Sequence, residues 1–125
     1  MKKIGRTRWV IPEGYIPPDE GGEKDPRFIS HETACLLNTG RRDAEVDITV
    51  FFSDREPAGL YHVTVPAERT LHLRFNDLCA PEEIPRDTEY STVIESSVPI
   101  VLQHTRLDSR REALSLHSTI AYGAD

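Results

Sequence analysis

Hydrophobic and polar residues alternate with a period of two along much of this chain. In AEVDITVFF (Ala44–Phe52) every second residue is apolar, and YHVTV (Tyr61–Val65) and TLHLRF (Thr70–Phe75) repeat the pattern. Successive side chains of a strand point to opposite faces of a sheet, so the pattern predicts three strands with one face on a core. Turn residues at Ser53–Gly59 and Pro66–Glu68 predict that these strands pair in order, as a meander.

Five further segments are predicted strands: Thr7–Ile11, Phe28–Asn38, Tyr90–Ser96, Val98–Leu107 and Ser115–Tyr122. No long segment has the 3.6-residue period of an amphipathic helix. The Ser109-to-Glu112 spacing of a capping box predicts at most one short helical turn near 109–114. About eight strands with frequent turns indicate an all-β fold, an antiparallel β-sandwich resembling a jelly roll.

Length and composition fit a single folded domain over residues 1–125. The chain is 38% hydrophobic and 29% charged, as in soluble globular proteins. The first residues are basic, but Arg6 and Arg8 interrupt any signal-peptide hydrophobic region, and no run is long enough to span a membrane. Cys35 and Cys79 form no CxxC pair, so a reducing, cytoplasmic setting is expected.

Charge and motifs exclude several function classes. The net charge of -6 disfavours general nucleic-acid binding. The basic amino terminus and Arg110–Arg111 nevertheless leave a DNA-associated role open. Five histidines occur without an H-x-H pair, so no metal site is expected. The chain also lacks a G-x-S-x-G elbow and a P-loop, so we expect neither an enzyme nor a bound cofactor.

The segment VPIVLQHTRLDSR (Val98–Arg110) continues from core residues directly into polar ones. Strand parity places His104 and Arg106 on the same face as the apolar residues before them. A buried cation is costly unless it is paired, so Arg106 should meet a carboxylate inside the sandwich. The candidates are Asp108, Glu32 and Glu13.

Two other positions add polar or aromatic groups near strand ends. RFND places Arg74 and Asn76 on one face, and Trp9 lies on a short strand near Glu13. We expect Arg74 to share one pocket with His104 and Arg106. Such groups suit a small polar ligand, such as a sugar or an organic anion. They equally suit a satisfied hydrogen-bond network between strand ends or a polar subunit interface.

Several long segments resemble the cyanobacterial sensory rhodopsin transducer family. They are IGRTRWVIPEGYIPP (Ile4–Pro18), FISHETACLLNTG (Phe28–Gly40), FFSDREPAG (Phe51–Gly59), VPAERTLHLRFNDL (Val65–Leu78), VPIVLQHTRLDSR (Val98–Arg110) and STIAY (Ser118–Tyr122). The resemblance covers nearly the whole chain in order. The sequence departs from the family pattern mainly in residues 19–25, 40–46, 79–83 and 110–117. These surfaces are therefore expected to determine which partner is bound.

The resemblance implies a soluble β-sandwich protein that assembles as a homotetramer and couples at the cytoplasmic face to a seven-helix retinal photoreceptor, or to another receptor. It also implies similarity to carbohydrate-binding sandwiches and a DNA-associated regulatory role. Its polar positions define the candidate ligand-binding set. These are Trp9, Glu13, His31, Glu32, Arg74, Asn76, Asp77, Gln103, His104, Arg106 and Asp108.

Overall fold

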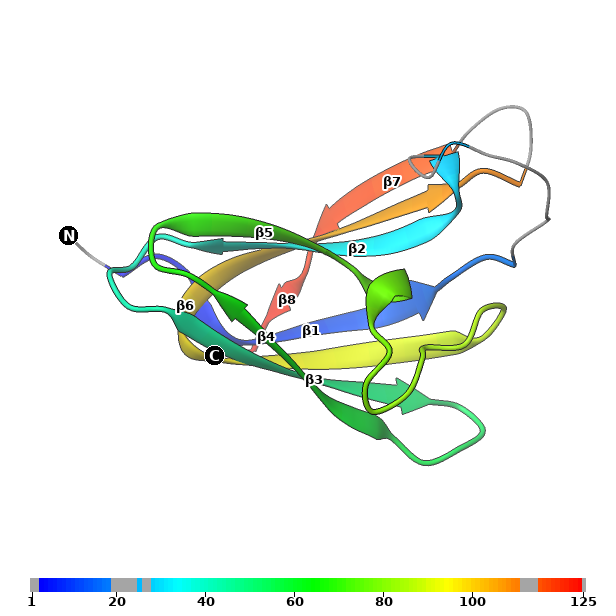
Figure 1. The fold of residues 1–125 in the computed structure, drawn as a ribbon, viewed down its shortest axis with the longest axis horizontal. Helices are drawn as coiled ribbons and strands as arrows, with labels where there is room; N and C mark the ends of the chain where they lie inside the picture. The colour runs from blue at the N-terminus through cyan, green and yellow to red at the C-terminus, as the bar shows by residue number, and fades with distance from the viewer. Residues whose placement is uncertain (1–2, 19–24, 26–27, 111–114, 125) are drawn as a thin grey trace.

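The computed structural model describes residues 3–18, 25, 28–110 and 115–124, which form an all-β fold (Figure 1). Its elements are β1 (Arg6–Tyr15), β2 (His31–Asn38), β3 (Ala44–Phe52), β4 (Ala58–Val65), β5 (Arg69–Arg74), the 3₁₀ turn η2 (Phe75–Asp77), β6 (Glu89–Asp108), β7 (Ser115–Ile120) and β8 (Tyr122–Gly123). All strand pairs are antiparallel. The predicted fold class is confirmed.

Strand β6 joins the two layers of the sandwich. Its first part pairs with β1 through residues 89–100 and with β3 through residues 90–96. Its second part pairs with β2 and β7 through residues 101–108. One layer therefore has the order β4-β3-β6-β1-β8 and the other β5-β2-β6-β7. Figure 1 shows β6 bending back between the layers, so that its two ends lie at the same end of the molecule.

The sequence predicted two strands where β6 is one continuous strand of 20 residues. The apolar alternation continues on both sides of Pro99, from Val98 to Ile100 and Leu102, and all three side chains are buried. The bend thus changes the partner strands without interrupting the core face.

The predicted meander of three strands is wrong at its last step. β3 pairs with β4 as expected, but β5 crosses to the other layer and pairs with β2. Buried Asn38 stabilises the crossover between the layers, because its Nδ2 donates hydrogen bonds to the carbonyls of Arg42 at 2.8 Å and Val65 at 3.0 Å. A turn sequence defines where the chain reverses, but these long-range bonds select the partner strand.

The alternating segments supply the core as predicted. Val46, Ile48 and Val50 of β3 are fully buried, and Tyr61 of β4 is 1% exposed. Leu36 and Leu102 of the other layer belong to the same buried core. Each such side chain contributes about 1.5–3 kcal/mol of hydrophobic stabilisation.

Several element boundaries differ from the predicted ones. β1 continues past Pro12 to Tyr15, because a register shift between Ile11 and Gly14 leaves the proline outside the regular ladder. β2 begins at His31 rather than Phe28. The last predicted strand divides into β7 and β8, which pair with different layers.

The predicted helical turn near 109–114 lies mostly outside the described residues. The described helical turn is instead η2, which follows β5 directly. Among the described helices none is long and apolar enough to cross a membrane.

Candidate functional site

A buried carboxylate marks the end of the sandwich where β6 begins and ends. Glu32, the second residue of β2, is 0% exposed and lies directly opposite Arg106 on β6. Parity explains its position, since Glu32 shares the inward face of β2 with Ala34 and Leu36. A charge at this depth requires compensation from its neighbours.

Three residues, two on β6 and one on β1, supply that compensation. The Nε and the NH2 group of Arg106 each lie 3.0 Å from Oε1 of Glu32, and His104 donates from Nε2 to the other carboxylate oxygen. The backbone N–H of Tyr15, at the end of β1, also donates to Oε1. Of the three carboxylates that the sequence offered to Arg106, the structure therefore selects Glu32.

A second set of bonds fixes the backbone around Glu32. Asn76 in η2 accepts from the Glu32 N–H at 3.2 Å and donates to the Ser30 carbonyl at 3.1 Å. The hydroxyl of Ser30 accepts from the Ser109 N–H at 2.8 Å. The turn after β5 thus joins the start of β2, and β2 joins the end of β6.

A pocket of about 530 Å³ opens beside this network. It is lined by residues 12–15 of β1, residues 51–53 at the end of β3, residues 89–91 of β6, and Arg106. The bend in β6 explains how residues at its two ends, Tyr90 and Arg106, line one pocket. The site therefore depends on long-range folding rather than on one contiguous motif.

Tyr90 forms a buried wall of the pocket. Its side chain is 3% exposed, and among the described residues its hydroxyl has no hydrogen-bond partner. Burial raises the pKa of Tyr90 well above its usual value, the charge of Glu32 raises it further, and Arg106 opposes the shift. The hydroxyl therefore stays protonated and retains both a donor and an acceptor for another group.

Gly14 allows the Tyr90 ring to lie against the backbone of β1. The two residues are directly opposite in the β1–β6 pairing, and a Cβ at position 14 would lie 2.6 Å from Cζ of the ring. Phe75 packs edge-on against the same ring with centroids 6.2 Å apart. The position of the Tyr90 hydroxyl is thus fixed by packing.

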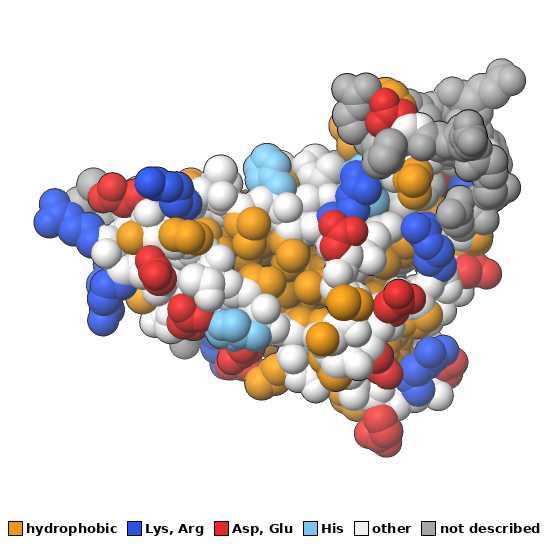
Figure 2. Space-filling model, in the orientation of Figure 1, with side chains coloured by type: hydrophobic (Ala, Val, Ile, Leu, Met, Phe, Trp, Pro, Cys, Tyr) orange, Lys and Arg blue, Asp and Glu red, His pale blue; other side chains and the backbone are white. Residues whose placement is uncertain are grey.

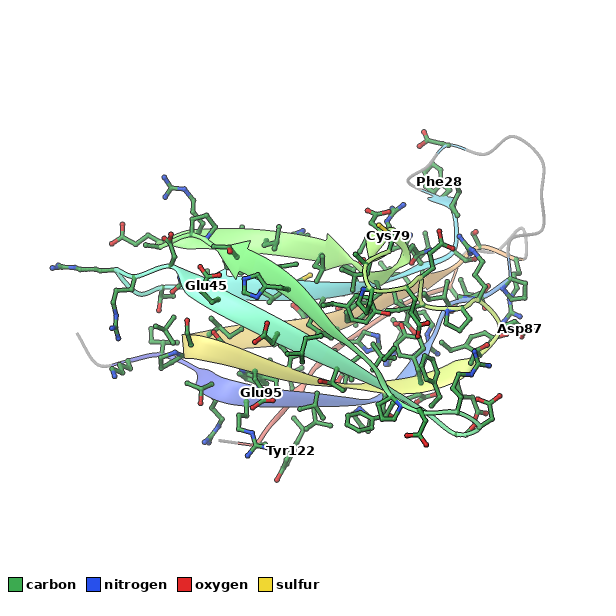
Figure 3. All side chains as sticks on the ribbon, turned by 60° about the horizontal axis from the view of Figure 1, so that its bottom comes forward. Phe28, Glu45, Cys79, Asp87, Glu95 and Tyr122 are labelled. Atoms are coloured by element: carbon green, nitrogen blue, oxygen red, sulfur yellow. The ribbon has the colours of Figure 1, made fainter. Side chains whose placement is uncertain are left out.

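A charged cluster lies nearby, at the outer end of β1. Tyr15 donates its hydroxyl to Asp87, which Figure 3 places at this end of the molecule, and Arg110 lies over the Tyr15 ring at 5.8 Å. The bond to Asp87 raises the pKa of Tyr15. The Arg110 guanidinium, 2.7 Å from Asp108, lowers the pKa of that carboxyl. Asp108 thus pairs with Arg110 rather than with Arg106.

The structure brings only some of the predicted site residues to this end. Glu32, His104, Arg106 and Asn76 form the network, Glu13 lines the pocket, and Asp108 lies at its margin. His31 precedes Glu32 but bonds through Nδ1 to the Ile29 carbonyl at 2.6 Å, and Asp77 is exposed in η2.

Three predicted residues lie elsewhere. Trp9 is buried in the core, where its indole N–H donates to the Ile100 carbonyl at 3.1 Å. Arg74 is paired with Thr33 on the outward face of β2, so the expectation that it shares a pocket with Arg106 is wrong. Gln103 is exposed and donates to Ser118 at 3.0 Å.

Sequence reasoning missed Tyr90, Tyr15, Ser30 and Ser109. Tyr90 has the ordinary pattern of a core aromatic on a strand, and Tyr15 contributes through its backbone. Ser30 lay inside the predicted strand Phe28–Asn38, and Ser109 was read as the first residue of a capping box. Gly14 beside Tyr15 is a signal that could have indicated a close backbone approach, although it does not identify the partner.

Comparison with known proteins gives this site a family context. The family model described as Anabaena sensory rhodopsin transducer matches residues 4–123. No curated protein is significantly similar to the chain. A solved structure of the Anabaena sensory rhodopsin transducer is 61% identical, covering 87% of this chain and 94% of its own, with a TM-score of 0.78.

A crystal structure of Thermotoga maritima 1070 is 37% identical, with 94% of each chain covered and a TM-score of 0.83. The two structures share the fold with this chain over most of its length. Together with the family model, they establish that this chain belongs to the Anabaena sensory rhodopsin transducer family.

Proposed function

We propose that this protein is a cytoplasmic signal-transducing adaptor that acts by protein–protein contact and catalyses no reaction. Its partner in this proposal is a membrane photoreceptor of the sensory rhodopsin type, and its working form is a homotetramer. The family match over residues 4–123 is the observation that carries the proposal. The 61% identical relative, described as a sensory rhodopsin transducer, supports the same role.

Exposed hydrophobic side chains support the contact role. Phe51 is 42% exposed, Leu60 60% and Tyr122 66%. Phe51 and Tyr122 lie on the outward face of one layer. Tyr122 is in register with Thr49 across the sheet, through Val10 and Val93. Phe51 is two residues after Thr49 on the same strand and therefore points to the same face. Figure 3 shows Tyr122 projecting away from the sheet. Apolar side chains grouped on a surface are typical of interaction sites.

Binding to a purified seven-helix retinal photoreceptor in lipid nanodiscs tests the proposal. We expect saturable binding of the wild-type chain that differs between light and dark. Leu60→Glu should weaken it, whereas Thr70→Glu, an exposed change on the other layer, should not. Absence of binding by the wild-type chain in both light and dark would contradict the receptor proposal.

The Tyr90 hydroxyl, which has no hydrogen-bond partner among the described residues, favours a second candidate function, binding of a small polar ligand or carbohydrate. Tyr90, Arg106 and Glu13 all line one pocket, and their side chains include both hydrogen-bond donors and acceptors. Phe51 and Phe52 add apolar surface to its lining. A small number of directional polar groups in a partly apolar pocket is typical of small-molecule binding sites.

A thermal-shift screen of monosaccharides and small organic anions tests this candidate. We expect at least one compound to raise the melting temperature of the wild type and of Tyr61→Phe, but to raise that of Tyr90→Phe much less. Tyr61 is the matched control because its hydroxyl is already bonded to the Glu82 carbonyl at 2.7 Å. A screen without stabilising compounds, or an equal shift in both variants, would count against the pocket.

A further inference from the structure

A second pocket, with a volume of about 430 Å³, lies at the end of the sandwich opposite Tyr90 and Arg106. Four segments that are far apart in the sequence line it: the residues before β1, the β2–β3 turn, the β4–β5 turn and the bend of β6. Figure 1 shows these segments together at the left end, beside the amino terminus. The candidate site described above lies at the other end, so this pocket is a separate feature.

Positive charge dominates the lining of this second pocket. Lys3, Arg41 and Arg42 line it, and Glu68 is the one acidic residue among its described lining residues. Figure 2 shows Lys and Arg side chains at this end of the molecule. The whole chain, in contrast, has 21 acidic and 15 basic residues. The pocket therefore concentrates positive charge in a protein that is acidic overall.

The three cations of this pocket lack ion-pair partners within the described part of the chain. No salt bridge or side-chain hydrogen bond joins any of them to another described residue. Arginines elsewhere are paired with carboxylates, as Arg110 is with Asp108 at 2.7 Å. Cations that share one pocket repel each other, and an added anion relieves that repulsion.

The turn that carries Arg41 and Arg42 is held by the buried side chain of Asn38. Its Oδ1 accepts from the Gly40 N–H at 3.0 Å, and its Nδ2 donates to the Arg42 carbonyl at 2.8 Å. The Glu68 N–H donates to the Gly40 carbonyl at 3.0 Å, which joins this turn to the β4–β5 turn. The backbone under the arginines is thus ordered without a ligand, which lowers the entropy cost of binding one.

Gly5 holds the amino-terminal segment against the bend of β6. Its φ is 102°, and a Cβ at this position would overlap the Ile100 carbonyl oxygen, so the close approach requires glycine. The approach places Lys3 and Ile4 in the lining of the same pocket as Pro99. Ile4 is 48% exposed, so the pocket has apolar surface beside its cations.

We propose that this pocket binds a small soluble anion of the phosphate class, such as a phosphate monoester or pyrophosphate. Guanidinium groups bind phosphate oxygens through charge-assisted hydrogen bonds, often two for each group. Three cations and one carboxylate leave a net charge of +2, which matches a phosphate monoester of charge about −2 near neutral pH. Ile4 and Pro99 offer apolar surface to the organic part of such a ligand.

The shape and charge of the protein favour a small anion over a nucleic acid. The cations converge on one pocket, whereas duplex DNA presents its charges in a long row and is bound by cations spread along it. The net charge of -6 also opposes attachment to a long polyanion. This site goes beyond the proposed adaptor role and does not depend on it.

Calorimetric titration of the untagged chain with pyrophosphate and with glycerol 3-phosphate tests the proposal. Arg41→Gln/Arg42→Gln should weaken binding at least about tenfold, because a hydrogen bond to a charged group typically contributes that much. Arg8→Gln/Arg55→Gln is the matched control, since it removes the same charge from two exposed arginines outside the pocket and should bind as the wild type does. A wild type that binds neither compound, or equal weakening in both double variants, would overturn the proposal.

Glu68→Gln tests the same pocket with the opposite sign. It removes the negative charge from the described lining, so it should tighten pyrophosphate binding, a result that a misfolded variant would not give. Affinity that is unchanged or weaker in this variant would overturn the assignment to this pocket.

NMR titration with pyrophosphate locates the anion. The amide signals of Gly40 and Arg41 should shift, whereas that of Gly14 in the Tyr90 pocket should not. Shifts at Gly14 alone would place the anion in the other pocket and overturn this inference without affecting the receptor proposal. Duplex DNA is the competitor: tighter binding of DNA that pyrophosphate does not displace would assign the surface to nucleic acid instead.

Discussion

Glu32 and Arg106 lie directly opposite each other on β2 and β6, with both the Nε and the NH2 group of the arginine 3.0 Å from one carboxylate oxygen. The carboxylate is fully buried and the arginine side chain is 24% exposed, so the pair connects the core with the pocket. Because His104 and the Tyr15 backbone donate to the same carboxylate, Glu32 organises three strands at once.

Removal of Glu32 should be strongly destabilising. Glu32→Ala leaves Arg106 and His104 without their acceptor in a buried setting, which should lower the free energy of unfolding by about 3–5 kcal/mol. Urea denaturation measures the change. Glu13→Ala is the matched control, because Glu13 is an exposed carboxylate at the same end of the sandwich and should cost less than about 0.5 kcal/mol. Equal stability of the two variants would contradict the network.

Removal of the Tyr90 and Tyr61 hydroxyls should change the free energy of unfolding differently, because only the Tyr61 hydroxyl has a described hydrogen-bond partner. The Tyr90 hydroxyl is buried without a described partner, so Tyr90→Phe should leave stability unchanged or raise it by up to about 1 kcal/mol. Tyr61→Phe removes a bond of 2.7 Å to the Glu82 carbonyl and should cost about 0.5–1.5 kcal/mol. Chemical denaturation of both variants checks this, and a larger loss for Tyr90→Phe than for Tyr61→Phe would refute it.

Asn38 should be needed for the crossover between layers. Asn38→Asp keeps the acceptor for the Gly40 N–H but loses the Nδ2 that serves the Arg42 and Val65 carbonyls. A buried carboxylate would then face two carbonyls, so we expect a loss of at least about 2 kcal/mol in thermal or urea unfolding. Thr88→Ala, which removes a single bond to the Arg86 carbonyl, should cost no more than about 1 kcal/mol. Similar losses would argue against Asn38 as the organising residue.

His62 should titrate above its usual range. Bonds to Asp47 at 2.8 Å and Glu45 at 2.7 Å raise its pKa, on an outer face where Asp47 also lies opposite Glu95 of β6. Figure 2 shows acidic and histidine side chains exposed on one face of the molecule. Because the folded-state pKa is raised, the stabilisation is complete below the unfolded pKa of about 6.5 and is lost as the pH rises through the folded value.

A pH series of melting temperatures and an NMR titration check this prediction. The difference between wild type and His62→Gln should be largest at mildly acidic pH and shrink toward alkaline pH. The double variant Glu45→Gln/Asp47→Asn should lower the pKa of His62. A difference that grows with pH would show the opposite linkage.

The polar end of β6 illustrates how far sequence reasoning reaches into the site. Parity alone predicted that His104 and Arg106 face inward and that Arg106 requires a carboxylate, and both hold. Parity gave no basis for choosing Glu32 over Asp108, because that choice depends on β2 pairing beside β6. Trp9 was predicted to belong to the ligand-binding set, yet its side chain lies in the core.

Local periodicity is a property of neighbouring residues, so the sequence by itself determined the strands, their inward faces and the all-β class. Pairing between strands is decided by contacts between residues far apart in the chain, which no local pattern encodes. Only the tertiary structure therefore placed β5 beside β2 and bent β6 so that Tyr90 meets the pocket of Arg106. The same long-range pairing places β7 beside β6 alone among the described strands.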